Sequence, residues 1–410
     1  GIGSGNHAVT YVNRTEQGRL LELPLSWYRK LNGWAMSPGY ESASHMDMRR
    51  EISDACLFCH AAYPATPEAR LTPRSIDCSR CHGSTAAHLA KPGRGTILNP
   101  AKLSNERRLE VCLQCHLETV SQGIADSYRQ PGRDVFSYQP GEPLQAYKLY
   151  FDRADSPEPR LEVNHAGYRM LQSACFKASK GKLTCTTCHD PHTAKARNAC
   201  LDCHASPKHT QQVSQDCAGC HMQKKPTNDA IHVTMTDHWI QTKPAAPHAD
   251  HAPYPGRVVS FYTKADADTL AMANVRAPNE EAAALYRRRL KRDPKDTATR
   301  AALANTLLRL GQGKEAIAEA ERTLRLDPSH SSALNTLGVA HGMNGDHEKA
   351  LATFERAKAA NPDHSLTWLN LGVTYGTLGR KQEAVAALRE AIRLQPDFTE
   401  ARQRLATLIP

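Results

Sequence analysis

The sequence lacks several features that common classes of protein need. None of its 410 residues belongs to an apolar run of 18 or more, so no segment is predicted to span a membrane. Aromatic residues make up 6% and hydrophobic residues 40% of the chain, which predicts a thin side-chain core for this length. The chain begins with Gly1 instead of methionine or cysteine. This predicts a removed signal peptide and gives no indication of a lipid anchor on an N-terminal cysteine.

The scattered cysteine spacing of a secreted disulfide scaffold is also missing. Of the 13 cysteines, all but Cys175 occur in pairs of the form Cys-x-x-Cys, and a histidine follows each pair directly. The pairs are Cys56 and Cys59, Cys78 and Cys81, Cys112 and Cys115, Cys185 and Cys188, Cys200 and Cys203, and Cys217 and Cys220. The histidines that follow them are His60, His82, His116, His189, His204 and His221.

This pattern matches the chemistry of c-type haem attachment. Two thiols two positions apart can reach the two vinyl groups on one porphyrin edge, and the next residue can place an imidazole on the iron. A zinc site or a redox dithiol needs the cysteines but not the histidine. Six matches out of six therefore predict six covalently bound haem c groups, with the six histidines as proximal iron ligands.

The spacing of the motifs predicts how the haems are grouped. Only 22 residues separate Cys56 from Cys78, and 15 separate Cys185 from Cys200, so neighbouring haems should lie close together. The interval of 73 residues from Cys112 to Cys185 predicts two groups of three haems. The thirteenth cysteine, Cys175, is predicted to be buried and unreactive, with a disulfide to another chain as the alternative.

The second axial ligand of each iron decides between an electron carrier and a catalyst. Ten histidines of the predicted haem region remain after the proximal six, so bis-histidine ligation with low potentials and no vacant site is the expectation. The candidate distal ligands are His7, His45, His88, His165, His192, His232 and His238, with His209 ranked below them. His248 and His251 lie in a proline-rich stretch and are not expected to be ligands. Methionine ligation by Met46, Met48 or Met222 remains a less favoured alternative.

The formal charge of +10 does not predict nucleic-acid binding here. Each bis-histidine ferric haem would add about one net negative charge, because two propionates outweigh the charge of the iron–porphyrin core. The basic residues are expected to pair with propionates. Since haem is attached to such proteins outside the cytoplasmic membrane, a periplasmic or extracellular location is predicted.

Several segments resemble one known family beyond the bare motif. Cys81-His82-Gly83 with His88, the run from Cys185 to His189-Asp190-Pro191-His192, and Cys220-His221-Met222 resemble parts of the multihaem cytochrome superfamily. That superfamily is related to cytochrome c-554, pentahaem nitrite reductase and octahaem oxidoreductases. Gly5-Asn6-His7 and Thr236-Asp237-His238-Trp239-Ile240 resemble members that carry tetratricopeptide repeats.

The resemblance covers residues 5–240 as separate motifs. It implies that histidines such as His88 and His192, just past a motif, ligate another haem of the cluster. One departure is that no Cys-x-x-Cys-Lys motif occurs, although pentahaem nitrite reductases carry one at the catalytic haem. The resemblance thus supports the fold and electron transfer more than any reaction.

The predicted fold is mainly α. Residues 1–240 are expected to form a loop-rich hexahaem domain with short helices near the motifs and one hairpin, in which a turn over residues 15–18 joins strand-like runs at Val9–Tyr11 and Leu21–Leu23. Residues 241–260 are rich in proline and are predicted to be a linker. Residues 261–410 are predicted to be an α-solenoid.

The solenoid prediction rests on an internal repeat. Prolines recur every 34 residues at 294, 328, 362 and 396, and glycines recur with the same period at 311, 345 and 379. This period is typical of tetratricopeptide repeats. Full repeats are expected at about 295–328, 329–362 and 363–396, with a capping helix at 397–408. Such solenoids bind peptides or partner proteins.

Two classes of function remain after this reasoning. The first is an electron carrier whose repeats dock other redox proteins or copies of the chain, extending to an extracellular conductive filament with haem contacts between subunits. The second is an oxidoreductase that acts on a small nitrogen or sulfur compound at one open haem. A scaffold in which the haems play no part is disfavoured, because six haem attachments would then serve nothing.

Overall fold

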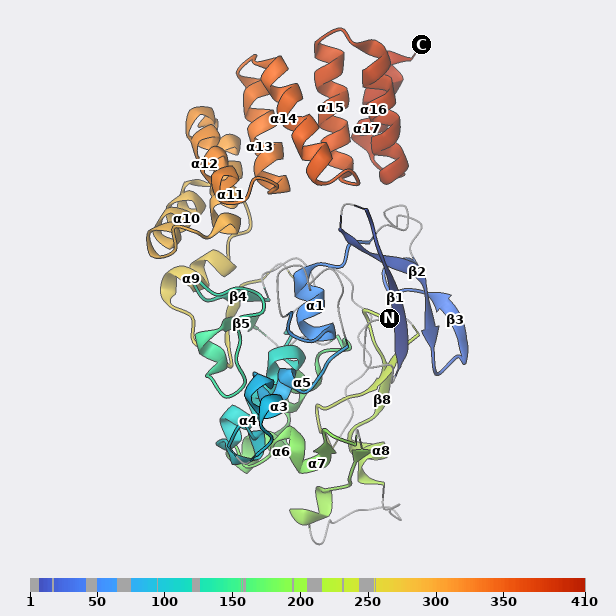
Figure 1. Cartoon of the computed structure of the whole chain (residues 1–410), viewed down its shortest axis with the longest axis vertical. Coiled ribbons are helices and arrows are strands. Elements are labelled where there is room, and N and C mark those ends of the chain that lie inside the picture. The colour runs from blue at the N-terminus through green and yellow to red at the C-terminus, as the bar shows by residue number, and fades with distance from the viewer. Residues whose placement is uncertain are drawn as a thin grey trace. The chain divides into compact units, whose positions relative to one another are not determined.

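The computed structural model describes residues 7–409 except 17, 42–49, 65–74, 94, 120–125, 156, 158–159, 194, 205–215, 231, 243–253 and 255. The chain divides into two compact units, one ending at Ala265 and the other continuing from Asp266 to the C-terminus. Figure 1 shows strands and short helices in the first unit and paired helices in the second. Within the described residues, no helix is both long and apolar enough to cross a lipid bilayer.

The first unit begins with the predicted hairpin. Strands β1 (Ala8–Arg14) and β2 (Leu20–Tyr28) are antiparallel, and the backbone N–H of Gly18 closes the turn on the carbonyl of Thr15 at 2.9 Å. Gly18 has a φ of +80°, a conformation that glycine adopts without steric cost. A third strand, β3 (Gly33–Met36), pairs with β2 and was not predicted, because four residues are too few to show an alternating pattern.

A second sheet joins segments that are far apart in the sequence. Its order is β10–β5–β4, formed by Val258–Phe261, Lys148–Arg153 and Ser127–Arg129. Residues at the end of the predicted linker therefore complete a sheet of the first unit, which extends past residue 240 to Ala265. Two short two-stranded sheets pair β6 (His189–Asp190) with β7 (Lys195–Ala196), and β8 (Lys224–Pro226) with β9 (Thr234–Thr236).

The helices of the first unit are short. The α-helices are α1 (Asp54–His60), α2 (Ser79–His82), α3 (Ala86–Ala90), α4 (Asn105–His116), α5 (Ala166–Gln172), α6 (Ala174–Ser179), α7 (Cys185–Cys188) and α8 (Cys217–His221). Among the described residues, short 3-10 helices are η2 (Pro100–Lys102), η3 (Leu144–Ala146) and η4 (Cys200–Asp202).

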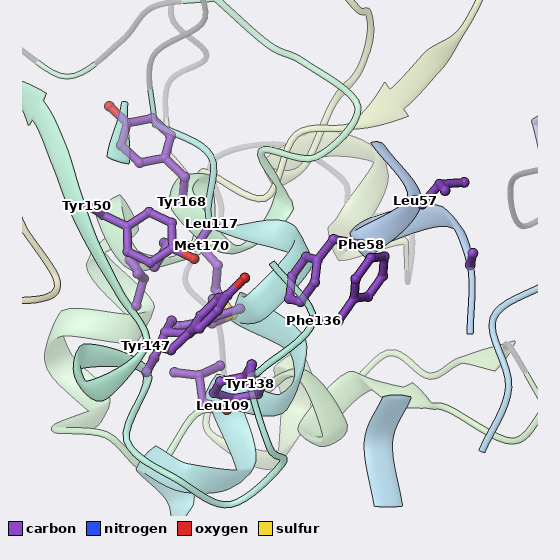
Figure 2. Packing of buried hydrophobic residues seen from close by; sticks show 14 of the residues in the cluster. Leu57, Phe58, Leu109, Leu117, Phe136, Tyr138, Tyr147, Tyr150, Tyr168 and Met170 are labelled. Carbon is purple, nitrogen blue, oxygen red and sulfur yellow. The ribbon is translucent and has the colours of Figure 1, made fainter. Parts of the chain in front are cut away.

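The scarce aromatic residues are concentrated in one cluster of the first unit (Figure 2). Tyr138, Tyr150 and Tyr168 are fully buried there. The Tyr168 hydroxyl donates to the Asp152 carboxylate at 2.9 Å, so a buried polar atom is satisfied. Phe58, from the first Cys-x-x-Cys-His motif, is part of the same cluster. The core of this unit is thus built directly against the motifs.

The second unit consists of helices in antiparallel pairs. Its helices are α9 (Ala267–Ala273), α10 (Glu280–Arg292), α11 (Thr297–Arg309), α12 (Gly313–Leu326), α13 (Ser331–Met343), α14 (His347–Ala360), α15 (Ser365–Thr377), α16 (Lys381–Leu394) and α17 (Thr399–Leu408). The pairs α11–α12, α13–α14 and α15–α16 coincide with the three predicted repeats, and α17 coincides with the predicted cap.

The repeating residues have repeating roles in this unit. Gly311, Gly345 and Gly379 each lie between the two helices of a pair with a φ of +78°, +83° and +73°. This left-handed conformation ends the first helix of each pair, and glycine adopts it without strain. The recurring alanines at positions 316, 350 and 384 are fully buried, because only a small side chain fits where the two helices approach closely.

Candidate haem-binding sites

Each Cys-x-x-Cys-His motif folds as a helical turn. The N–H of His82 donates to the carbonyl of Cys78 at 2.9 Å, and the N–H of His204 donates to that of Cys200 at 2.9 Å. Residues at positions i, i+3 and i+4 of a helical turn share one face. Both thiols and the imidazole of each motif are therefore presented on the same side, as attachment to one porphyrin requires.

Motifs that are far apart in the sequence lie close together in the fold. The thiols of Cys59 and Cys115, of Cys112 and Cys185, and of Cys200 and Cys217 lie close enough to shift one another's pKa. The third and fourth motifs are thus in contact although 73 residues separate them. The helices α4 and α7 thus bring the third and fourth motifs close together, and the grouping of the haems into two sets of three stays a prediction.

Two pairs of histidines have their imidazole rings close together and nearly parallel. The ring centroids of His82 and His192 lie 6.0 Å apart with an angle of 20° between the ring planes. Those of His189 and His238 also lie 6.0 Å apart, with an angle of 30°. A metal ion binds an imidazole nitrogen at about 2.0–2.1 Å, which places two opposite ring centroids about 6 Å apart. Each pair brings a predicted proximal histidine together with a predicted distal one, at a centroid distance compatible with one iron between them.

The second ring nitrogen of several of these histidines is already hydrogen-bonded. Nδ1 of His82 lies 2.6 Å from the carbonyl of Leu98, Nδ1 of His238 lies 2.9 Å from that of Thr236, and Nδ1 of His221 lies 2.8 Å from that of Gln241. A carbonyl only accepts, so Nδ1 carries the proton. Nε2 is then the unprotonated nitrogen that can bind iron.

His165 is the most deeply buried of the distal candidates. It is fully buried at the N-terminus of α5, and its Nε2 makes no hydrogen bond, the closest charged oxygen being that of Glu162 at 3.4 Å. A buried nitrogen without a hydrogen bond is costly unless another partner satisfies it. Coordination to an iron would supply that partner, which supports the prediction of His165 as a ligand.

The other predicted distal ligands have the following surroundings in the described part of the chain. His88 is half-buried on α3, with Nδ1 2.8 Å from the Thr96 hydroxyl. The ring of His232 packs edge-on against that of Tyr28 with centroids 5.1 Å apart, and His7 is exposed just before β1. Met222 is half-buried at the end of α8. His45, His209, His248, His251, Met46 and Met48 lie outside the described residues.

Crowding of the imidazoles favours their neutral form. Burial lowers the pKa of His116, and the nearby His238, His60 and His189 lower it further. Burial also lowers the pKa of His60. Both residues are nevertheless partly exposed to solvent. A neutral imidazole is the form that binds a metal ion.

A buried ion pair that sequence reasoning missed holds His238 in place. Asp237 accepts hydrogen bonds from Arg169 Nε at 2.9 Å and Nη2 at 2.7 Å, and from Lys225 Nζ at 2.9 Å. Burial raises the pKa of Asp237, but these bonds and the Arg169 charge outweigh it and bring the pKa to about 2. Arg169 also stacks on the Trp239 ring at 4.6 Å. The sequence gives no indication of this contact, because Arg169 and Asp237 are 68 residues apart.

Cys175 is half-buried on α6, less buried than predicted. Burial raises the pKa of its thiol, and the neighbouring Cys203 of the fifth motif raises it as well. A raised pKa disfavours the reactive thiolate, in agreement with the expectation of an unreactive cysteine.

The donor set can be compared with what a haem iron requires. In the described part of the chain, no three side chains of His, Cys, Asp or Glu converge as an all-protein metal site. A haem iron needs only two protein ligands, because the porphyrin provides the others. The pairs His82–His192 and His189–His238 meet that requirement.

Comparison with known proteins identifies the C-terminal part. The family model "Tetratricopeptide repeat" matches residues 301–365 and 344–398, so this part of the chain contains tetratricopeptide repeats, as predicted. No curated protein sequence matches the chain.

Several solved structures of repeat proteins are similar to about a third of the chain. The crystal structure of MamA is 27% identical and covers 32% of this chain and 75% of its own, with a TM-score of 0.30. TTC0263, a thermophilic TPR protein of Thermus thermophilus, is 28% identical with coverages of 32% and 72% and a TM-score of 0.29. YrrB, a TPR protein with an unusual peptide-binding site, is 26% identical with coverages of 30% and 64% and a TM-score of 0.28.

Proposed function

We propose that this chain is a multihaem electron-transfer protein whose repeats dock its redox partners or further copies of itself. The observation that carries the proposal is the combination of six attachment motifs, each folded with its two cysteines and histidine on one face, with imidazole pairs 6.0 Å apart. When bound, the haems would supply one-electron exchange between ferric and ferrous iron.

In this proposal neighbouring haem sites follow one another through the protein, because their motifs lie close together. The contact of Cys59 with Cys115 links the first motif to the third, and the contact of Cys112 with Cys185 links the third to the fourth. The backbone of Ala199, next to Cys200, lies close enough to the Cys188 thiol to act on its pKa, which links the fourth motif to the fifth. Cys200 and Cys217 link the fifth to the sixth. Short steps between neighbouring sites suit the transfer of electrons along the protein.

The repeats supply the docking surface in this proposal. Tetratricopeptide repeats present extended surfaces that bind peptides or partner proteins. Partners would be other redox proteins or copies of the chain, including an extracellular filament, in the periplasm or outside the cell. The competing function is an oxidoreductase of small nitrogen or sulfur compounds, which needs one iron without a distal histidine.

Electron paramagnetic resonance of the oxidised protein, with and without nitrite or hydroxylamine, tests the proposal. Six low-spin haems that do not respond to either compound are expected for an electron carrier. A high-spin haem whose signal shifts on addition of nitrite or hydroxylamine would instead favour the oxidoreductase.

A further inference from the structure

The second motif contains a buried cation without a counter-charge among the described residues. Arg80, between Cys78 and Cys81, is 3% exposed, and neither of its terminal guanidinium nitrogens makes a hydrogen bond. Its position is fixed, because the side-chain amide of Gln114 donates to its backbone carbonyl at 3.0 Å. Buried charges in proteins are normally paired, so an unpaired guanidinium indicates a missing anionic partner.

The immediate neighbours of Arg80 are aromatic. Its guanidinium lies 4.3 Å from the ring centroid of Phe58 and 4.2 Å from that of Tyr63. Figure 2 shows Phe58 facing Phe136 at the edge of the aromatic cluster. Aromatic faces attract a cation, but more weakly than an opposite charge does, and the two terminal nitrogens are left without an acceptor.

The hydroxyl of Tyr63 does not provide the missing charge. It donates to the carbonyl of Tyr138 at 2.7 Å. Burial raises the pKa of Tyr63 to about 12, although the Arg80 charge opposes the rise. Tyr63 therefore stays neutral at physiological pH and cannot act as a counter-ion.

Arg80 lies where three attachment motifs meet. Burial raises the pKa of the Cys81 thiol, and the Arg80 charge acts against this rise. The same charge reaches the thiols of Cys59 in the first motif and Cys115 in the third. A group attached at any of these motifs would come within range of the guanidinium.

We propose that Arg80 binds a propionate carboxylate of a haem attached at one of the first three motifs, and that it thereby raises the potential of that haem. This inference rests on the proposed function, since it requires haem at these motifs. The planar guanidinium matches a carboxylate with two parallel hydrogen bonds, which a lysine cannot form. An unbalanced propionate near an iron stabilises the ferric state, and a paired arginine removes that effect.

The test compares Arg80→Gln and Arg80→Lys with the matched control Arg133→Gln in the full chain. Arg133 also lies over an aromatic ring, that of Tyr147 at 5.4 Å, but it forms an ion pair with Glu142. Haem content is measured first by mass spectrometry, and the potentials of the individual haems are then measured by redox titration followed by electron paramagnetic resonance.

The expected result is six haems in every variant and a lower potential for one haem in Arg80→Gln. The change should be tenfold or more in the reduction equilibrium, which corresponds to about 59 mV for one electron. Arg80→Lys should show a smaller decrease in the same haem, and Arg133→Gln none. If Arg80→Gln is not recovered as folded protein, the decrease of the haem potential in Arg80→Lys decides whether the inference holds.

Two results would overturn the inference. Unchanged potentials in Arg80→Gln and Arg80→Lys, with six haems present, would show that no haem carboxylate meets Arg80. The second result is a haem potential that shifts with added phosphate or acetate in the wild type but not in Arg80→Gln. It would show that the partner of Arg80 is an anion from solution. A wild-type chain without covalent haem would instead contradict the proposed function, which keeps the two failures distinct.

Discussion

Replacing His238 and His192 by alanine, singly and together, tests whether each completes a different iron. The ring of His238 lies 6.0 Å from that of His189, and the ring of His192 lies 6.0 Å from that of His82. That separation is compatible with one metal ion bound to a nitrogen of each ring at about 2.0–2.1 Å. Removal of either imidazole should leave one iron with a single protein ligand and should not affect the other pair.

The expected magnitude is one haem for each substitution. His238→Ala should convert one low-spin haem to high-spin, His192→Ala should convert another, and the double variant should convert two. His238→Met should raise the potential of one haem, within the span of about 0.8 V that axial ligands set. His347→Ala, at the start of α14 in the repeat unit, is the control and should change nothing.

The assay is electron paramagnetic resonance of each oxidised variant, with the number of high-spin haems obtained by integration. The reasoning would be refuted if His238→Ala kept every haem low-spin. It would also be refuted if the double variant contained only one high-spin haem, because both histidines would then serve the same iron.

Three other predictions concern stability. Asp237→Asn should lower the free energy of unfolding by about 2 kcal/mol at neutral pH, because the pKa of Asp237 falls from 3.8 to about 2 in the folded state. That contribution is present above about pH 4 and is lost as the pH falls towards 2. The free energies of unfolding of wild type and variant, measured with urea, should therefore converge in acid. A difference that stays constant with pH would contradict the assignment to the Arg169 ion pair. Gly338→Ala should destabilise the repeat unit by about 1–3 kcal/mol in thermal unfolding, because the new Cβ would lie 2.5 Å from Phe354. The control is Gly342→Ala on the same helix, whose Cβ would meet its nearest atom at 3.9 Å, so this variant should be neutral or stabilising. Equal melting temperatures for the two glycine variants would exclude the proposed packing. A chain produced without haem should keep slow hydrogen exchange in α11–α16 and lose it at the motif helices, and equal protection in both units would show that haem does not support the first unit.

The parts of this fold that sequence could predict are those with a local signal. The Cys-x-x-Cys-His turns and the 34-residue repeat each depend on residues close together in the chain, and the helices lie where the repeat placed them. The turn at Gly18 is equally local, since a few residues close it. Periodicity and turn chemistry act over a few residues, which is why they can be recognised without the fold.

The parts that sequence could not predict depend on long-range contacts. Strand β10 belongs to the first unit only because it pairs with β5, more than a hundred residues earlier in the chain. The set of distal candidates could be predicted from the surplus of histidines, but the pairing of His82 with His192 could not, since spacing carries no information about it. The same holds for the Arg169–Asp237 ion pair, which is visible only once α5 and the segment after β9 are in place.

The measurement that tests the central claim most directly is the mass of the denatured, purified chain from a host that attaches haem c. Covalent haem survives denaturation, so the account predicts a mass that exceeds that of the polypeptide by six haems, with each haem on one of the six Cys-x-x-Cys-His peptides after digestion. A chain from the same host with the mass of the polypeptide alone, and with all six cysteine pairs free or oxidised to disulfides, would contradict it.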